Sequence, residues 1–454
     1  MSRAPATPTR GRGLYAEGTS EASGGGLSRA EALKAFQEDP EIAGLRLWWG
    51  LCYANAMGVC GIVLVALGST LSALAADAGT TATKAGTVFL ARGVGAVTGT
   101  VASARLFRVG RRGNSILAAI LLALMVVLAC LPAIDALWTM HAAWFALGLC
   151  TSTLDTGCQI MTRRVHGTLA GPWLGANTVA FAVSGALVPL LQIATGNLFW
   201  QYGVLAGVAL LNAVAFLFLP HPEDDHLARR LPPRVSLLKE TTQPRYYGVE
   251  VLTGGAVFWL IGGKVDMTSY VGSYVETTRV IPVGDIPWLL VCMWALIIVG
   301  RILGLADQVA LKEAPSARVL RHLVAWMATS VAGAAVCVAL PRSATALWVG
   351  CALYSFGNGP TVGYLYDYLN RTTDATEEGM CVVMFGLNVG ASVVPYLTTI
   401  VWDRTASGPI TLLWVTLLAA SAPIFLVAAA AALAGKRESK DLLAVTKAEA
   451  RALL

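Results

Sequence analysis

The sequence predicts an all-α membrane protein whose chain crosses the bilayer many times. Only 13% of its 454 residues are charged, against roughly 25% in an ordinary soluble domain. The hydrophobic fraction is 56%, and the apolar residues fall into twelve long runs. Since a helix that spans the hydrocarbon core takes about 20 residues, twelve spans and their loops fit this length. These observations exclude a disordered chain and argue against a soluble enzyme.

Two sets of six apolar segments, separated by a charged interruption, predict two six-helix bundles. We divide the chain into a disordered cytoplasmic N-tail (1–45), an N-terminal bundle (46–219), a cytoplasmic linker (220–246), a C-terminal bundle (247–434) and a cytoplasmic C-tail (435–454). No apolar stretch lies near Met1, so we expect the first span to act as the insertion signal. The predicted spans are 46–75, 84–106, 114–133, 138–162, 173–195, 199–219, 247–275, 286–309, 319–341, 345–368, 379–402 and 409–434.

The distribution of Lys and Arg predicts that both ends of the chain lie in the cytoplasm. With this orientation, the outer loops hold only Lys84, Arg279, Arg342 and Arg404. The formal net charge of +6 is then explained by topology, and we expect no nucleic-acid partner. The cytoplasmic loops and the linker hold the remaining loop cations: Arg105, Arg108, Arg111, Arg112, Arg163, Arg164, Arg229, Arg230, Arg234, Lys239, Arg245, Lys312, Arg318, Arg321 and Arg371.

Internal repetition links the two bundles. A shift of 206 residues lays the fourth and fifth spans on the tenth and eleventh, so that Gly157 meets Gly363 and Val188-Pro189 meets Val394-Pro395. A shift of 209 residues aligns Arg92 with Arg301. Parallel repeats of this kind are related by an axis along the membrane normal and enclose a polar cavity near the midplane. We therefore expect a shared cavity between two pseudo-symmetric bundles.

Several short motifs resemble the major facilitator superfamily. Arg108-Val109-Gly110-Arg111-Arg112 follows the second span and is similar to the Asp-Arg-x-Gly-Arg-Arg signature of that superfamily. Phe107 stands where the signature has Asp and Ser103 where it has Gly, so a carboxylate latch is in doubt. The resemblance implies a major-facilitator-type fold, with a gating loop that contains Arg108, Gly110, Arg111 and Arg112. The same arginines would equally serve as cytoplasmic anchors.

A narrower set of motifs resembles the sodium-dependent glucose transporter and fucose permease branches. The fourth span contains Leu154-Asp155-Thr156-Gly157-Cys158-Gln159, which is similar to their Leu-Asp-Thr-Gly-Gly-Asn stretch. Gly171-Pro172-Trp173 and Val188-Pro189-Leu190-Leu191 resemble the two ends of their fifth span, and Gly300-Arg301 resembles a Gly-Arg pair of their eighth. This resemblance implies a sugar as the transported solute.

The second and eighth spans each contain an arginine. An ionisable side chain inside a span costs about 2.5–3.5 kcal/mol on insertion scales, so Arg92 and Arg301 each need a partner or a role. Arginine remains protonated at any relevant pH. Facing the cavity, the two would bind sugar oxygens, a carboxylate or a phosphate. The alternative is a structural ion pair, of Arg92 with Asp155 or of Arg301 with Asp307.

Asp155 of the fourth span is the leading candidate for solute and ion binding. It lies two turns before Arg163 in a stretch that is otherwise Ala, Leu, Gly and Thr, so we expect it at hydrocarbon depth. Gln159 lies four residues after it and Ser152 three before, on the same helix face. That face would bind sugar hydroxyls, and the carboxylate would bind a proton or a cation. The alternative is a carboxylate paired with an arginine that holds helices together.

The seventh span is irregular. Gly262-Gly263 precedes Lys264 and Asp266, which are two residues apart and therefore point to different sides of a regular helix. A helix break at the glycines would let both charges coordinate a ligand, as in broken transporter helices. Alternatively, the hydrocarbon core ends near Gly262 and both charges are solvated. Glu250, at the cytoplasmic start of this span, resembles the family's Gly-x-Glu and is a further candidate coupling carboxylate.

The tenth span carries a polar stripe. Asn358, Thr361 and Tyr364 follow one another at three-residue steps, and Thr361 is the repeat counterpart of Asp155. Aromatic, amide and hydroxyl groups together suit a sugar ring. Further candidates for the cavity, each equally able to serve helix packing, are Asn55, Asn177, Trp259 and Asn388.

Taken together, these features predict a secondary active or facilitative transporter of a small polar solute, with a sugar as the leading substrate. Coupling to H+ or Na+ would use Asp155, Glu250 or Asp266. The alternatives are a transporter of an organic anion or metabolite and a non-transporting receptor with the same fold. No Walker loop is present, so we expect no direct drive by ATP. The five histidines are scattered towards loops and helix ends, so we expect no enzyme.

We also expect a monomer without a metal or cofactor, in the plasma membrane or an internal membrane. The nine cysteines lie in or beside apolar runs and have no metal-ligand spacing, so they are interpreted as packing residues.

Overall fold

The computed structural model describes residues 40–109, 112–166, 170–222, 248–311, 314–373, 377–405 and 408–452. These residues are almost entirely helical, as expected for a chain that must satisfy its backbone groups in lipid. The N-terminal bundle contains α2 (Pro40–Asp77), α3 (Ala82–Ala85), α4 (Val88–Val109), α5 (Gly113–Cys130), α6 (Leu137–His166), α7 (Ala170–Thr195) and α8 (Leu198–Phe218). The C-terminal bundle contains α10 (Gly248–Thr278), α11 (Ile286–Ala310), α12 (Ser316–Ala339), α13 (Ala344–Thr372), α14 (Glu377–Arg404) and α15 (Thr411–Ala452).

Three short 3-10 helices complete the described secondary structure: Leu131–Ala133, Val283–Asp285 and Gly408–Ile410. Among the described residues, 9 helices are long and apolar enough to cross a membrane. The long helices that fall short of this criterion are α4, α6 and α13. They carry Arg92, Asp155 and Asn358 respectively. The protein is thus an all-α, multi-pass integral membrane protein, and each of its three least apolar long helices carries a candidate site residue.

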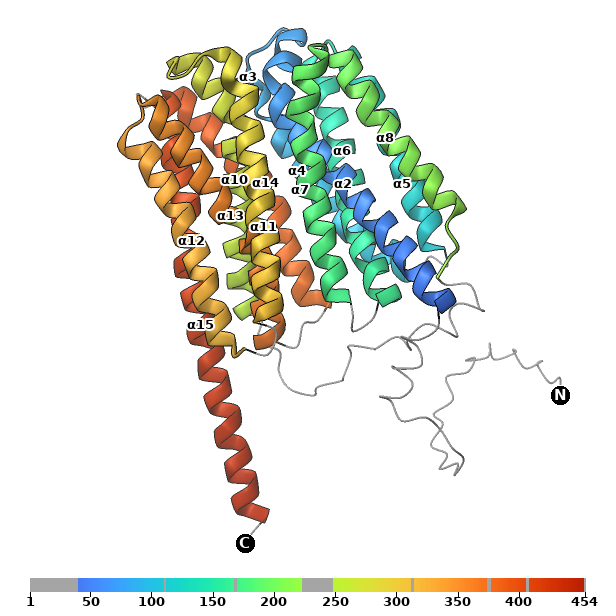
Figure 1. The fold of residues 1–454 in the computed structure, drawn as a ribbon, viewed down its shortest axis with the longest axis vertical. Coiled ribbons are helices and arrows are strands. Elements are labelled where there is room, and N and C mark those ends of the chain that lie inside the picture. The colour runs from blue at the N-terminus through green and yellow to red at the C-terminus, as the bar shows by residue number, and fades with distance from the viewer. Residues whose placement is uncertain are drawn as a thin grey trace, which may run out of the picture.

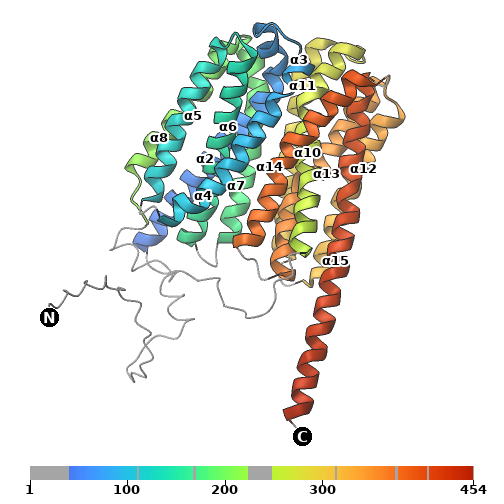
Figure 2. The same cartoon turned by 180° about the vertical axis from the view of Figure 1, so that it is seen from behind.

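The two bundles lie side by side (Figure 1), and the view from behind shows the same division (Figure 2). In the N-terminal bundle α4 packs on α6, α2 on α7 and α5 on α8; in the C-terminal bundle α10 packs on α14 and α15, and α13 packs on α11 and α12. The bundles meet where α2 contacts α10, α4 contacts α14 and α7 contacts α11. Helix α2 begins and α15 ends on the same side (Figure 1), which we call the inner side and predict to be cytoplasmic.

Small residues allow close packing inside each bundle. A Cβ added to Gly99 of α4 would lie 2.5 Å from the Leu149 carbonyl oxygen of α6, and one added to Gly300 of α11 would lie 2.4 Å from the Phe356 carbonyl oxygen of α13. The backbones of these pairs therefore approach too closely for any side chain at the two glycines.

These contacts make Gly99 and Gly300 structural counterparts, which differs from the shift of 209 residues in the sequence comparison. Under the structural pairing, the ends of α4 and α11, Val109 and Ala310, also correspond. Arg301 then matches Thr100, and Arg92 lies eight residues nearer the outer side, about 12 Å at 1.5 Å per residue. Because small residues recur along both helices, the sequences of α4 and α11 can be aligned at several offsets. The backbone contacts favour the alignment that pairs Gly99 with Gly300.

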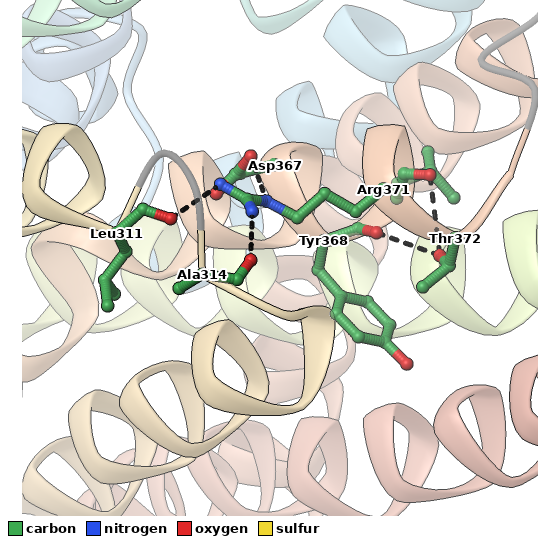
Figure 3. A network of polar contacts seen from close by, with 7 residues as sticks. Leu311, Ala314, Asp367, Tyr368, Arg371 and Thr372 are labelled. Carbon is green, nitrogen blue, oxygen red and sulfur yellow. Dashed lines mark hydrogen bonds and ion pairs between the residues drawn. The ribbon is translucent and has the colours of Figure 1, made fainter.

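An arginine at the inner end of α13 caps the C-terminal end of the neighbouring helix α11. The Arg371 guanidinium donates hydrogen bonds to the carbonyls of Leu311 (3.2 Å) and Ala314 (2.7 Å) and to the Asp367 carboxylate (2.9 Å) (Figure 3). In the N-terminal bundle, Arg164 of α6 donates similarly to the Phe107 carbonyl of α4. A cation at a helix C-terminus satisfies free carbonyls and interacts favourably with the helix dipole. The two bundles thus share one way of anchoring their inner ends.

Candidate functional site

Asp155 and Gln159 form a polar pair on α6. The Gln159 amide donates a 2.8 Å hydrogen bond to Oδ1 of Asp155, and both side chains are half-buried. Ser152, one turn before Asp155, takes part in the contact of α4 and α6 with α14 of the other bundle. Its hydroxyl bonds Thr100 of α4 at 2.6 Å, and Asn388 of α14 donates to both hydroxyls at 3.3 and 3.5 Å. Asn388 therefore connects the C-terminal bundle to α4 and α6.

Arg92 is buried without a full set of partners. Its side chain is 7% exposed, and Nε and Nη1 have no hydrogen-bond partner. No ion pair joins it to Asp155, although both interact electrostatically with the Cys60 thiol of α2. The alternative of a structural Arg92–Asp155 pair is therefore not formed in the structure, and two guanidinium donors remain for another acceptor.

Helix α10 is continuous through Gly262-Gly263, and both following charges are buried. Lys264 is 3% exposed and Asp266 is 0% exposed, so neither a helix break nor solvated charges describes this segment. Close packing explains the glycines. A Cβ added to Gly262 would lie 2.7 Å from the Gly390 carbonyl oxygen of α14. A Cβ added to Gly263 would lie 2.4 Å from the Cβ of Ala419 in α15.

Asp266 and Lys264 point into different surroundings. The Thr398 hydroxyl of α14 donates to Oδ2 of Asp266 at 3.0 Å, whereas Oδ1 has no partner. For the Lys264 side chain, no hydrogen bond or ion pair occurs among the described residues, and the charged group that acts on it is Arg301, another cation. The two charges of α10 therefore do not neutralise each other.

Arg301 spans the two bundles at the contact of α11 with α7. Its guanidinium donates to the carbonyl of Thr178 in α7 and to that of Gly359 in α13 (3.3 Å), and it lies 5.7 Å from the centre of the Phe181 ring. Asp307 is not its partner. That carboxylate accepts hydrogen bonds from Tyr364 and from His322 Nδ1 (2.7 Å). The Tyr364 side chain of α13 consequently contacts the Asp307 carboxylate, which also binds His322 of α12, and it is not a partner of Lys264 or Arg301.

The other candidates from the C-terminal bundle have separate contacts. Asn358 donates to the Leu260 carbonyl of α10 at 3.3 Å and leaves Oδ1 without a partner. The Thr361 hydroxyl is buried and donates to the Asn358 carbonyl at 2.8 Å. Trp259 is half-buried, with its ring edge-on to Phe258. Glu250 is buried near the inner start of α10, and its Oε2 has no partner.

The remaining candidates lie at the margins of this region. Asn177 is buried and donates to the Thr162 hydroxyl at 3.3 Å. Asn55 is exposed on α2, and Arg112 is exposed just before α5. Gly110, Arg111 and the side chain of Arg108 lie outside the described residues, so the predicted gating loop is described only at its edges.

The buried polar groups that were not among the sequence candidates include one in α11 and one in α13. Trp294 Nε1 of α11 and Ser355 Oγ of α13 have no hydrogen-bond partner in the described structure. Trp294 also lies close to α7, because an added Cβ on Gly185 would be 3.6 Å from its ring. An apolar run with one Trp or one Ser resembles ordinary packing, so the sequence contains no signal that singles these two out.

The outer halves of the bundles are in direct contact. A Cβ added to Gly68 of α2 would lie 2.7 Å from the Ser269 hydroxyl of α10, and one added to Gly93 of α4 would lie 2.6 Å from the Ser392 hydroxyl of α14. Further out, the rings of Phe89 and Tyr270 are 5.9 Å apart. The α7–α11 contact extends further inward, since Gly175 faces Leu305.

Residues 51–395 of the chain match the family model of the Major Facilitator Superfamily. None of the curated proteins matches the chain.

Proposed function

The chain belongs to the Major Facilitator Superfamily and is thus a membrane transporter; on this premise we propose that it moves a small polar solute by alternating access. We propose that the solute binds between the bundles, at a site lined by Asp155 and Gln159 of α6, Lys264 of α10 and Asn358 of α13. Members of the superfamily are in general not enzymes, and we propose no catalytic step.

The observation that carries this proposal is the set of unpaired polar atoms at bilayer depth. Nε and Nη1 of Arg92 and Oδ1 of Asn358 are buried without partners, and Lys264 has no counter-ion among the described residues. An unpaired buried polar group costs about 1–3 kcal/mol, and a charged one costs more. A solute that completes these hydrogen bonds would recover that free energy when it binds.

For the binding site, we propose Asp155, Gln159, Asn55 and Arg92 from the N-terminal bundle, with Trp259, Asn358, Thr361 and Arg301 from the other. A sugar, as the resemblance to glucose transporters and fucose permeases implies, would use the amide and carboxylate groups. An organic anion is the second candidate, which the unpaired Arg92 and Lys264 favour. Asn177, Asn388 and Tyr364 would contribute by supporting the helices around the site.

Asp155 is the strongest of the three candidate coupling carboxylates. It is half-buried with a single hydrogen bond, from Gln159, so a proton or Na+ can reach it from the site. Asp266 is completely buried against Thr398, and Glu250 lies at the inner end of α10. We propose that an ion bound at Asp155 favours solute binding at the adjacent amide.

The test is uptake by the purified protein in lipid vesicles. Sugars and organic anions are offered with an imposed proton or sodium gradient, and collapse of the gradient with an ionophore is expected to stop accumulation of the transported solute. A thermal shift on ligand addition, measured in parallel, separates binding from transport. Binding without flux under any gradient would favour the non-transporting receptor and would contradict the transport mechanism.

A further inference from the structure

Lys264 lacks the partner that a buried ammonium requires. Its side chain is 3% exposed and makes no hydrogen bond or ion pair with any described residue. Asp266, two residues on, lies roughly 200° around the helix and is bonded to Thr398 of α14. The nearest carboxylate along the chain therefore cannot neutralise this lysine.

The other charge near Lys264 increases the need for an anion. Arg301 acts on Lys264 electrostatically as a second cation, and its own donors bind the main-chain carbonyls of Thr178 and Gly359. Carbonyl oxygens satisfy hydrogen bonds but carry no net charge. Two positive charges thus act on each other midway along α10 and α11, and no described acidic side chain pairs with either.

Uncharged polar groups of α13 lie at the same depth. Asn358 contacts the Leu260 carbonyl, Tyr354 Oη would lie 3.2 Å from a Cβ on Gly263, and Arg301 contacts Gly359. These three contacts place Lys264 and Arg301 within about one and a half helix turns of each other along α13. The same stretch holds two of the buried polar atoms without a partner, Oγ of Ser355 and Oδ1 of Asn358.

We propose that the transported solute is a small polyhydroxylated carboxylate, such as a sugar acid, whose carboxylate binds the Lys264 ammonium. One free ammonium matches one carboxylate, whereas Arg301 already uses Nε and Nη1 for main-chain carbonyls. The solute hydroxyls would donate to Oδ1 of Asn358 and, on the other bundle, to the Asp155 carboxylate, and would accept from Gln159. This inference rests on the proposed function, since it assigns the chemistry of the same site.

Glucose and glucuronate form a matched pair of probes, because they differ only in a hydroxymethyl group and a carboxylate at one carbon. In vesicles containing the wild-type protein, glucuronate is expected to be taken up with at least about a tenfold higher kcat/KM than glucose, the equivalent of one charge-assisted hydrogen bond. Equal uptake of both, or uptake of glucose alone, would overturn the inference. Preferred uptake of glucose 6-phosphate would overturn it too, in favour of a phosphate.

The Lys264→Gln variant tests the residue itself. The ratio of kcat/KM for glucuronate to that for glucose is expected to fall at least about tenfold, and Lys264→Arg is expected to restore the preference for glucuronate. Lys84→Gln, on the outer side, is the matched control and is expected to change neither. An equal loss for both solutes in a variant with an unchanged melting temperature would contradict a contact with the carboxylate.

Thermal shifts separate this inference from the proposed function. A shift with glucuronate that Lys264→Gln abolishes, in a protein that shows no flux, would support the binding chemistry and contradict transport. Neither shift nor flux with either probe would refute the assignment of a sugar acid. Should Lys264→Gln fail to fold, the wild-type ratio for the matched probes and the Lys264→Arg variant decide the question alone.

Discussion

Asp155 combines three properties that set it apart from the other carboxylates of the membrane region. It is half-buried, it accepts one hydrogen bond from Gln159, and Arg92 does not neutralise it. A surface carboxylate has water as a partner, and Asp266 has Thr398 in a closed environment. Asp155 is therefore the residue at which a change of charge is expected to alter transport without unfolding the protein.

The Asp155→Asn variant retains the shape and the hydrogen bond but removes the charge. We expect gradient-driven accumulation to fall at least about tenfold, the equivalent of one ionic hydrogen bond, with normal surface expression. The exposed Asp135→Asn, in the outer loop before α6, is the matched control and is expected to be neutral. Accumulation at the wild-type level by Asp155→Asn would exclude the carboxylate from coupling.

At the residue scale, helical spacing brings Asp155 and Gln159 together, and this contact follows from the sequence. The burial of Lys264 does not follow, because Gly262-Gly263 is compatible with a helix break as well as with a close contact to α14 and α15. Only the neighbouring helices distinguish the two. The absence of an ion pair between Arg92 and Asp155 does not follow from the sequence either. The sequence is compatible with this pair, and only the surroundings of Arg92 in the structure show that it is not formed.

At the scale of the helices, α4–α6 and α11–α13 pack backbone to backbone through Gly99 and Gly300. The Gly300→Ala variant is expected to destabilise the protein by about 1–3 kcal/mol, because the new methyl group meets the Phe356 carbonyl. Gly203→Ala on α8 has open space around the new methyl group and is expected to be neutral. The melting temperatures in detergent provide the measurement. Equal melting temperatures for the two variants would show that α11 and α13 separate easily.

Hydrophobic runs predict the helices well and their relative register poorly. The predicted span 199–219 corresponds to α8, Leu198–Phe218, and the predicted span 286–309 to α11, Ile286–Ala310. The pairing of α4 with α11 differs, because Arg92 and Arg301 resemble each other chemically but lie at different depths. Helix α15 also continues to Ala452, beyond the apolar run that defines its span. The fold class itself is confirmed by the helices and by the family match.

At the scale of the whole molecule, alternating access requires the outer contacts between the bundles to open. Gly68 of α2 and Ser269 of α10 lie there, and a Cβ on Gly68 would be 3.2 Å from that of Ser269. This separation is about 0.3 Å below the range of about 3.5–4.5 Å at which disulfides form, so a small shift of α2 or α10 brings the two positions within it. The Gly68→Cys/Ser269→Cys double variant is therefore expected to form a disulfide under oxidation and to stop uptake, and a reducing agent is expected to restore it.

Each single variant, oxidised in the same way, is the control for the crosslink, because it has no partner thiol at this contact. Full uptake by a double variant that is completely crosslinked would show that the outer ends of α2 and α10 stay together throughout the cycle. The solute would then need an entry route other than separation of these helices, and the proposed mechanism would be wrong.

The contact of Arg301 with α7 has a consequence for tolerance to mutation. Its acceptors in Thr178 and Gly359 are peptide oxygens, which every amino acid supplies. Replacing the Thr178 side chain therefore leaves the acceptor in place, whereas loss of the guanidinium removes both bonds at once. The codon for Thr178 can therefore change without loss of this hydrogen bond, whereas both hydrogen bonds depend on the single codon that specifies Arg301.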